Sequence, residues 1–385
     1  MKYKVIHIIT RLDKGGAAEN TYLTYKLHNR EKYEVKIITG LNKRDIEVIL
    51  IPEFQREINL FLDLVAFYKI YKILRKEKPY IVHTHTSKTG ILGRWAAKFA
   101  GVPVIIHTPH GHIFYGYFNK LLTLLFILIE RLTSYITDYI ITLTKKGKEE
   151  HIKFKIAPPS KFIPIYSGIE FEKIKIKKDK IKIKKELKIP DCSIIIGSAG
   201  RLEPIKGFIY LIKSAEIVLK ELKREKIYFI VAGDGSLKEE LQREVVERGI
   251  ERNFKFIGWR EDVYDIINIS DIFVLPSLNE GMGRVILEAM YLGKPIIASK
   301  VGGIPEIVID GENGLLFESQ NYNELAEKII FLIKNPDLLE KMGENSKNLV
   351  RKKEFSAEGM VEKIEELYEK SISEKHSAFS FMCKD

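Results

Sequence analysis

The chain has 385 residues, of which 45% are hydrophobic and 30% charged, so it is long enough for two domains with their own cores. Its formal net charge of +11 permits nucleic acid, anionic lipid or an anionic substrate as a partner, but much of the excess lies in one lysine-rich segment. Two distant cysteines, Cys192 and Cys383, exclude a disulfide framework and a cysteine zinc site and favour a reducing cytoplasm.

The N-terminal half begins with an apolar run at residues 4–10, which predicts a buried first strand and is too short for a signal peptide. Gly15 and Gly16 follow in a loop, and a helical pattern starts at Ala17. Two glycines between a strand and a helix let a phosphate approach the backbone, although a simple Gly-Gly turn is the alternative. No G-x-G-x-x-G fingerprint of dinucleotide binding is present here.

A strand at residues 35–39 and an amphipathic helix at 60–74 precede a strand that carries two histidines. His83 and His85 lie two residues apart, so both rings point to the same face of that strand. A metal site would need a third ligand, which the nearby sequence does not offer, so no metal is predicted. A hydrogen-bonded structural pair and an acceptor site that includes Lys88 are both open interpretations.

The next predicted strand, at residues 102–107, leads into a loop with three histidines in six residues: His107, His110 and His112. An apolar stretch at 113–129 comes next. It is too short to span a bilayer, because Lys120 and Glu130 bound its longest apolar run. It is predicted to be either a core helix or a surface that touches membrane or a lipid-linked acceptor.

The second half opens with the lysine-rich segment 171–189, predicted to be the interdomain link and a first solvated helix. It lacks the aromatic residues expected of a nucleic-acid site, so nucleic acid is not predicted as a partner. A strand at 193–198 leads to Arg201 and Lys206, which lie five residues apart in a loop before a helix and suit two phosphates. Exposed cations without a ligand are the alternative. Gly233 ends the next strand, and Arg260 follows a later one.

The most informative stretch covers residues 271–290. A buried strand ends at Pro276, a loop with Gly281 and Gly283 follows, and a helix is predicted from Arg284. Such a strand, loop and helix N-terminus make an anion cradle. Glu280 and Glu288 are separated by seven residues, and ionised carboxylates accept hydrogen bonds from a hydroxyl-rich ligand. A solvated loop acid and a helix surface acid are the alternative.

Together these motifs resemble the family-4 retaining glycosyltransferases (glycosyl transferases group 1), through an E-x7-E motif at Glu280 and Glu288. The resemblance covers most of the chain and implies an α/β fold of the GT-B type, with two doubly wound Rossmann-like domains facing a central cleft. The segment at 166–170 also resembles the family, although Ser167 and Glu170 replace the family's Asn and Asp.

The resemblance implies catalytic roles for His110 and Glu280, with His112 as the competitor for the histidine position. It assigns the donor diphosphate to Arg201, Lys206, Gly15 and Gly16. It assigns the donor nucleotide and sugar to Glu288, Gly281, Met282, Gly283, Arg284, Arg260 and Gly233. The acceptor candidates are His83, His85, Lys88 and His112.

The predicted organisation is an acceptor-binding domain at 1–170, the basic link at 171–189 and a nucleotide-sugar-binding domain at 190–350. A C-terminal helix at 351–374 is predicted to return to the first domain, followed by a disordered tail at 375–385. The predicted location is cytoplasmic, at the inner face of the cell membrane if the 113–129 stretch touches lipid.

The predicted reaction moves a hexose or N-acetylhexosamine, with retention, from a UDP-sugar to a cell-surface polysaccharide or a polyprenyl-linked saccharide. No D-x-D motif is present, so the reaction is predicted to need no metal, and no cofactor is predicted beyond the nucleotide-sugar donor. The alternative on the same fold is a nucleotide-sugar 2-epimerase. An NAD-dependent oxidoreductase and a non-catalytic binding protein are more distant alternatives.

Overall fold

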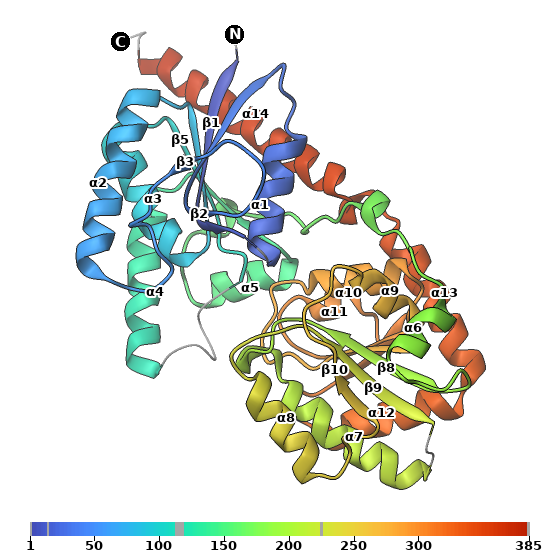
Figure 1. The fold of residues 1–385 in the computed structure, drawn as a ribbon. Helices are drawn as coiled ribbons and strands as arrows, with labels where there is room; N and C mark the ends of the chain where they lie inside the picture. Colours follow the sequence, from blue (N-terminus) through green and yellow to red (C-terminus); the bar gives the residue numbers. More distant parts are fainter. Residues whose placement is uncertain (1, 14, 112–118, 224–225, 383–385) are drawn as a thin grey trace. The chain divides into compact units, whose positions relative to one another are not determined.

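The computed structural model describes residues 2–13, 15–111, 119–223 and 226–382, and side chains up to residue 377. The chain divides into two compact units (Figure 1). Unit 1 comprises Met1–Gly168 with Ser356–Asp385, and unit 2 comprises Ile169–Phe355. Each unit is an α/β layer structure, because apolar strands alternate with amphipathic helices along the chain.

Unit 1 contains a seven-stranded sheet in the order β3-β2-β1-β4-β5-β6-β7. All of its pairings are parallel. Parallel sheets need cover on both faces, which explains why the strands are almost continuously apolar. The strands are β1 (Tyr3–Leu12), β2 (Tyr33–Asn42), β3 (Ile49–Leu50), β4 (Ile81–His85), β5 (Val104–Thr108), β6 (Tyr139–Thr142) and β7 (Phe162–Pro164).

Helices cover both faces of this sheet. Leu23 of α1 and Met360 of α14 pack with the strands in one apolar cluster. Ala66 of α2 and Ala96 of α3 pack in another, on the opposite face (Figure 1). The α-helices of unit 1 are α1 (Gly16–Leu27), α2 (Leu60–Glu77), α3 (Ser87–Ala100), α4 (Lys120–Ser134), α5 (Lys145–Lys153) and α14 (Ala357–Met382).

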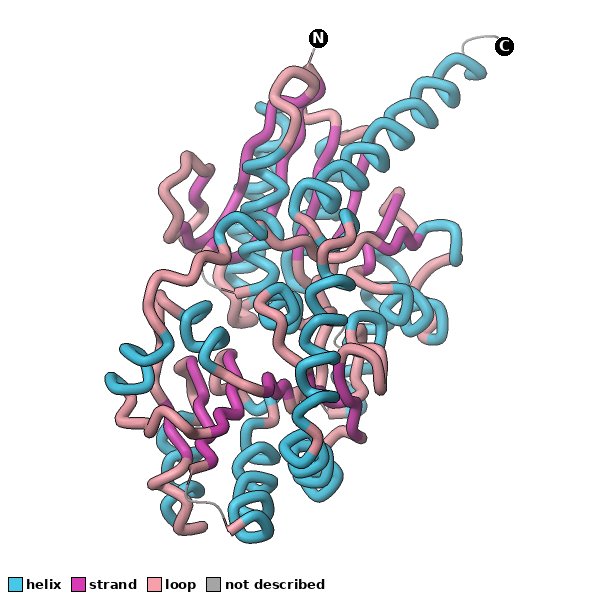
Figure 2. Tube along the Cα trace, turned by 90° about the vertical axis from the view of Figure 1, so that its right-hand side faces the viewer, coloured by secondary structure: helices cyan, strands magenta, loops and turns pink. Residues whose placement is uncertain are grey.

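Unit 2 contains a six-stranded parallel sheet in the order β10-β9-β8-β11-β12-β13. The strands are β8 (Ile194–Ala199), β9 (Ile227–Ala232), β10 (Phe254–Phe256), β11 (Ile272–Leu275), β12 (Ile296–Ser299) and β13 (Gly314–Phe317). The α-helices are α6 (Lys180–Glu186), α7 (Phe208–Leu222), α8 (Lys238–Glu247), α9 (Val263–Ile269), α10 (Arg284–Tyr291), α11 (Ile304–Ile307), α12 (Tyr322–Lys334) and α13 (Pro336–Val350). Figure 2 shows the strands between helices in each unit.

The main predicted strands and helices are confirmed to within a few residues, including the strand, loop and helix at residues 271–290. Three helices of unit 2, α8, α9 and α13, were not predicted from the sequence. The prediction of a disordered tail from residue 375 is wrong up to Met382, because α14 continues to that residue. The last residue of α14 in the apolar cluster is Ile372, and the helix continues for ten residues beyond it.

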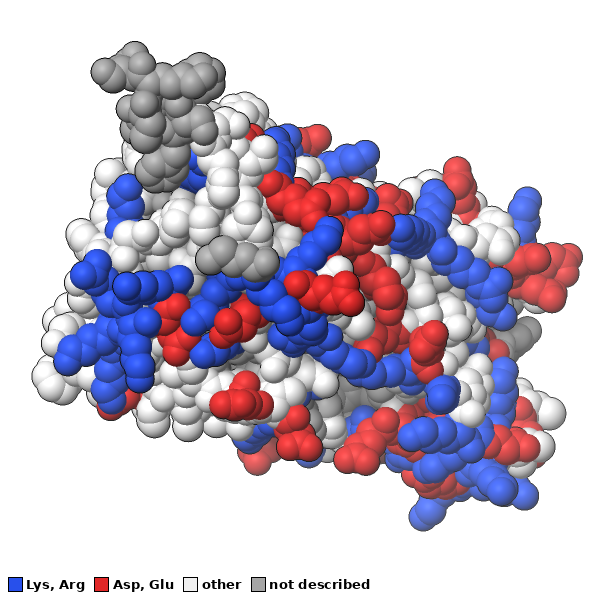
Figure 3. Space-filling model, turned by 90° about the horizontal axis from the view of Figure 1, so that it is seen from above, with Lys and Arg blue, Asp and Glu red and all other residues white. Residues whose placement is uncertain are grey.

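Two global properties bear on possible partners. On the face seen in Figure 3, Lys and Arg side chains are interleaved with Asp and Glu, so the positive charge does not form one continuous basic surface there. None of the helices in the described part of the chain is long and apolar enough to cross a membrane.

Lys294 is a buried cation in unit 2, at the amino end of β12. Its Nζ donates a hydrogen bond to the carbonyl oxygen of Asn268 (2.7 Å). Burial lowers the pKa of Lys294 to about 8. A pKa below that of the unfolded chain, about 10.4, means that the unfolded state binds more protons between these two pH values. The burial of this charge therefore opposes folding below pH 8, and the effect disappears as the pH rises toward 10.5.

We expect the stability advantage of Lys294→Met over the wild type to be largest at pH 7 and to shrink by about 2–3 kcal/mol by pH 10.5. The free energies of unfolding come from urea titrations at each pH. Lys300→Met, which removes an exposed lysine of the same unit, is the control and should show no such pH-dependent difference. A difference between Lys294→Met and wild type that stays constant across this range would contradict the assignment.

Candidate functional site

The sheet of unit 2 changes direction between β8 and β11. From β8 the chain proceeds to β9 on one side, and from β11 to β12 on the other. Loops at the carboxyl ends of two such strands diverge and leave a crevice, which is where open parallel sheets bind ligands. Arg201 and Lys206 follow β8, and residues 277–283 follow β11. The switch point thus brings together the two motifs that the sequence analysis singled out in this half.

Direct contacts join the two loops. The amide of Leu278 donates to the carbonyl oxygen of Ile205 (2.8 Å). Lys206 forms an ion pair with Glu280, and Ser277 Oγ donates to Glu280 Oε1 (3.0 Å). Glu280 is therefore held in place by a cation from one loop and a hydroxyl from its own loop. A carboxylate fixed in this way can accept further hydrogen bonds in a defined direction.

Arg201 differs from Lys206 in its surroundings. It is exposed, and among the residues that the structure describes its side chain has no hydrogen-bond or ion-pair partner. Its guanidinium can bind an anionic oxygen pair in a bidentate fashion without first breaking an internal contact.

The E-x7-E segment continues into α10. Gly283 is its N-cap, with φ of 77°, and has no side-chain capping hydrogen bond. A helix N-terminus of this kind offers backbone N–H groups and a partial positive charge to an anion. Met282 is buried, whereas Gly281, Arg284 and Glu288 are half-buried. Glu288 lies in the second turn of α10.

Two further predicted residues have structural contacts. The amide of Gly233, after β9, donates to the carbonyl oxygen of Gly258 (2.8 Å). Arg260 donates to both carboxylate oxygens of Asp262 (2.7 Å each) and forms an ion pair with Glu186 (2.7 Å). The hydrogen bonds from Arg260 hold the pKa of Asp262 well below its usual range. The charge of the Arg260 side chain is therefore already balanced by two carboxylates of unit 2.

Unit 1 has its own switch point, between β1 and β4. Gly15 and Gly16 follow β1 and begin α1, with Gly15 as the N-cap. Both glycines are exposed, and no described side chain caps the helix. Apart from its chain neighbours, no described residue has an atom within 4 Å of the position that a Gly15 Cβ would take. This N-terminus can receive an anion against its backbone.

The acceptor candidates of unit 1 have different surroundings. His83 and His85 are buried, and their rings stack with centroids 4.3 Å apart, which confirms that they share one face of β4. Lys88 forms an ion pair with Asp63 of α2. His110, after β5, is only partly buried and contacts His85 (Nε2 to Nδ1, 2.9 Å). His112 lies outside the described residues.

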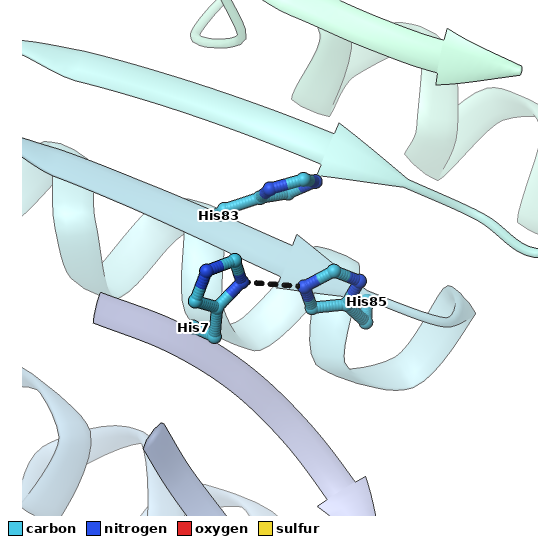
Figure 4. A group of neighbouring side chains, drawn as sticks. All are labelled: His7, His83 and His85. Atoms are coloured by element: carbon cyan, nitrogen blue, oxygen red, sulfur yellow. Dashed lines mark hydrogen bonds between the residues drawn. The ribbon is translucent and has the colours of Figure 1, made fainter. Parts of the chain in front are cut away.

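His7 joins His83 and His85 inside unit 1 (Figure 4). Burial lowers the pKa values of all three histidines well below the ordinary value. They are therefore neutral at pH 7. The sequence analysis missed His7, because it lies 76 residues before His83 and joins it only through the pairing of β1 with β4.

These three histidines each offer a ring nitrogen, and the three atoms lie within 4.8 Å of one another. Both nitrogens of His83 already bond within unit 1, to Tyr368 OH and Thr108 Oγ1 (2.7 Å each). His7 Nδ1 bonds to His85 Nε2 (2.9 Å). A metal ion would have to break these contacts, so the donor set does not favour a metal here.

Two family descriptions match the chain. Glycosyl transferases group 1 matches residues 179–349, and Glycosyltransferase Family 4 matches residues 14–173. The first therefore covers the switch point of unit 2, and the second covers that of unit 1.

Known proteins match over almost the whole chain. It is 31% identical over 377 residues to a UDP-Gal:alpha-D-GlcNAc-diphosphoundecaprenol alpha-1,3-galactosyltransferase of Escherichia coli, covering 95% of this chain and 97% of that protein. It is 29% identical over 367 residues to the capsular polysaccharide biosynthesis glycosyltransferase CapM of Staphylococcus aureus, covering 90% and 92%.

Solved structures show the same fold. HepE of Anabaena, in complex with UDP-glucose, matches with a TM-score of 0.80 at 20% identity, over 95% of this chain and 99% of that chain. WaaG, a glycosyltransferase involved in lipopolysaccharide biosynthesis, matches with a TM-score of 0.76 at 17% identity, over 94% and 98%.

The loop that carries Glu280 depends on Gly302. This residue has φ of 49°, and a Cβ on it would lie 1.8 Å from the carbonyl oxygen of Glu280. Gly311 also has a positive φ, 80°, but a Cβ there would meet no atom of the described residues within 4 Å, its chain neighbours apart. Gly311→Ala is therefore a matched control, because both substitutions carry the backbone penalty of about 1–2 kcal/mol and only one displaces the loop.

We expect Gly302→Ala to lower the free energy of unfolding by about 3–4 kcal/mol, against about 1–2 kcal/mol for Gly311→Ala. Urea titrations give both values. Equal losses in the two variants would show that the contact between Gly302 and Glu280 does not constrain the loop.

Proposed function

The chain belongs to the glycosyl transferases group 1 family and has the GT-B fold, and from that premise we propose that this glycosyltransferase is a retaining enzyme that uses a UDP-sugar. The proposed sugar is a hexose or N-acetylhexosamine, and no metal takes part. The galactosyltransferase relative named above uses UDP-Gal, and HepE was solved with UDP-glucose, which supports UDP as the nucleotide.

One observation carries this proposal: Arg201, Lys206 and Glu280 come together at the β8–β11 switch point. When the bond between sugar C1 and the donor phosphate breaks, negative charge grows on the diphosphate. Arg201 and Lys206 would stabilise that charge, together with the amides at the start of α10. The resemblance also assigns Gly15 and Gly16 of unit 1 to the diphosphate, and the exposed amides at the start of α1 could receive an anionic oxygen.

The two glutamates would hold the hydroxyl-bearing parts of the donor. Glu280, fixed by Lys206 and Ser277, would accept hydrogen bonds from the transferred sugar, and Glu288 would accept them from the ribose. Binding of the diphosphate would compete for Lys206 and so loosen its pair with Glu280. The same lysine would thereby couple the binding of phosphate and sugar.

In the proposed reaction the acceptor hydroxyl attacks C1 from the face that the diphosphate leaves. The C1–O bond to the phosphate breaks, a C1–O bond to the acceptor forms, and the acceptor proton moves to a phosphate oxygen. This sequence gives retention without a protein nucleophile. For His110 of unit 1 the resemblance implies a role in supporting the transfer.

For the acceptor we propose a saccharide carried on a polyprenyl lipid at the cytoplasmic face of the membrane. The galactosyltransferase relative acts on a diphosphoundecaprenol-linked sugar. The supporting feature of this chain is α4, whose outer face is strongly apolar. Five leucines of α4, and Tyr135 directly after it, are at least half exposed; the leucines are Leu121, Leu124, Leu125, Leu128 and Leu132.

Polar contacts explain why these leucines face outward. Arg94 of α3 is fully buried and donates to Glu130 of α4 (2.7 Å), and Trp95 donates to Thr133 (3.1 Å). The helix therefore packs on unit 1 through these polar residues and Ile127, and its leucine face stays exposed. An apolar helix surface of this kind suits the boundary between lipid headgroups and acyl chains.

The donor proposal is tested first by calorimetry with UDP, GDP, NAD, UDP-glucose, UDP-galactose and UDP-N-acetylglucosamine, with EDTA present. We expect the UDP-sugars to bind, and Glu288→Ala to weaken binding about tenfold, since it removes hydrogen bonds to the ribose. The double variant Arg201→Ala with Lys206→Ala should abolish sugar transfer in an activity assay. The control is Arg252→Ala, which removes an exposed arginine before β10 and should leave both binding and transfer unchanged.

Binding of NAD alone would overturn the transferase proposal. Conversion of a UDP-sugar to its 2-epimer, without any acceptor, would favour the epimerase. Transfer that persists in the Arg201 and Lys206 double variant would overturn the leaving-group assignment.

The membrane proposal is tested by sedimentation with vesicles of phosphatidylglycerol and phosphatidylcholine. We expect Leu124→Glu with Leu128→Glu to weaken vesicle binding roughly tenfold or more, because two apolar side chains lose their burial in lipid. Val246→Glu, at a residue equally exposed on α8 of unit 2, should have no effect. Equal binding of all three proteins, or no binding by the wild type, would overturn the proposal.

A further inference from the structure

A chain of hydrogen bonds runs through the interior of unit 1 and ends at His110. Glu365 of α14 contacts His28 (Oε1 to Nδ1, 2.9 Å), and His28 contacts His7 (Nε2 to Nε2, 3.3 Å). His7 then contacts His85 (Nδ1 to Nε2, 2.9 Å), and His85 contacts His110 (Nδ1 to Nε2, 2.9 Å). Three of the four histidines are buried, with exposures of 0–3% (His7, His28 and His85).

The protonation of this chain follows from its chemistry. A neutral imidazole has one N–H donor and one lone-pair acceptor, so each contact between two rings needs a donor on one side and an acceptor on the other. Burial lowers the pKa values of His7, His28 and His85, which keeps them neutral. The whole chain can then adopt only two arrangements, which differ in the direction of every hydrogen bond.

Glu365 selects between the two directions. Burial alone would raise the pKa of Glu365, but hydrogen bonds from His28 and from the amide of Asn29 (2.7 Å) hold it below the usual value. The carboxylate is therefore ionised and accepts only. His28 must place its proton on Nδ1, which makes its Nε2 an acceptor. His7 and His85 must then each carry the proton on Nε2.

We propose that Glu365, through His28, His7 and His85, holds His110 as the tautomer with its proton on Nε2 and its lone pair on Nδ1. These four are positioning residues, since they act on His110 through hydrogen bonds and not on the substrate. The inference rests on the proposed function in so far as His110 supports the transfer. The tautomer itself is a property of unit 1 and can be measured without turnover.

The neighbouring His83 is outside this chain. Its nitrogens face the hydroxyls of Tyr368 and Thr108, which can donate or accept, so no carboxylate fixes its tautomer. Its ring packs against those of His85 and His7, with centroids 4.3 and 5.2 Å away. His83 therefore packs beside the chain without taking part in its hydrogen bonds.

The backbone also fixes His110. Its φ is 60°, in the left-handed region that a residue with a side chain seldom adopts. Strained residues of this kind persist where the surrounding structure holds them. The contact with His85 is one such constraint, so the chain fixes both the position and the tautomer of His110.

The experiment is nitrogen-15 NMR of the full-length protein, labelled at histidine, at pH 7.5. Long-range correlations between ring carbon-bound protons and nitrogens show which nitrogen carries the proton. We expect protons on Nε2 of His7, His85 and His110 and on Nδ1 of His28. A wild-type spectrum with the His110 proton on Nδ1 would overturn the proposal directly, with no variant required.

The variants test the role of Glu365. In Glu365→Leu the acceptor is lost, so His110 should become a mixture of tautomers, and kcat should fall about tenfold with the KM for donor within about twofold. Glu365→Gln, whose amide oxygen can still accept, should restore both. Glu369→Leu removes an exposed acid one turn further along α14 and should match the wild type.

The outcomes separate this inference from the proposed function. Wild-type tautomers in Glu365→Leu would overturn the inference even if the enzyme transfers sugar. Tautomers as proposed, in a protein that transfers no sugar from any donor, would overturn the proposed function alone. One equivalent of zinc should leave the histidine signals unchanged. If zinc shifts the signals of His7, His83 and His85, these residues form a metal site and the proposed chain of hydrogen bonds is overturned.

Discussion

Parallel pairing of every strand in both described sheets is the constraint on which the rest of this structure depends. A parallel sheet requires a crossover after each strand, so all carboxyl ends lie at one edge and both faces need helices. The loops diverge only where the strand order reverses. This leaves one position in each sheet at which polar loops can surround a ligand. Gly15 and Gly16 lie at that position in unit 1, and Arg201, Lys206 and Glu280 lie there in unit 2.

The two switch points use opposite electrostatic solutions. In unit 2, charged groups are retained near the surface, and Lys206 is paired with Glu280 while Arg201 stays exposed. In unit 1, the polar groups are histidines that burial keeps neutral, linked by hydrogen bonds between rings. A buried charge without a partner is costly, whereas neutral imidazoles can be fully buried if each nitrogen finds a partner. The first solution suits a diphosphate, and the second suits the fixed orientation of one side chain.

α14 shows how a distant segment completes such a cluster. Its apolar residues Met360, Val361 and Ile364 belong to the core of unit 1, although they lie some 190 residues beyond the other residues of that unit. The same helix supplies Tyr368 to His83 and Glu365 to His28. By packing against α1 and β5, α14 thus covers the sheet and also sets the direction of the hydrogen bonds in the histidine chain.

The sequence by itself determined the local features. Apolar runs at residues 4–10 and 271–275 predicted buried strands, and the spacing of Glu280 and Glu288, with Arg201 and Lys206, identified the family, because these patterns are written over short distances along the chain. Only the tertiary structure decided that the face of α4 is exposed, that Arg260 is neutralised by Asp262 and Glu186, and that His7, His28 and Glu365 join His85. The physical reason is that burial and hydrogen-bond partners depend on which strands and helices become neighbours, and no pattern within one segment records that.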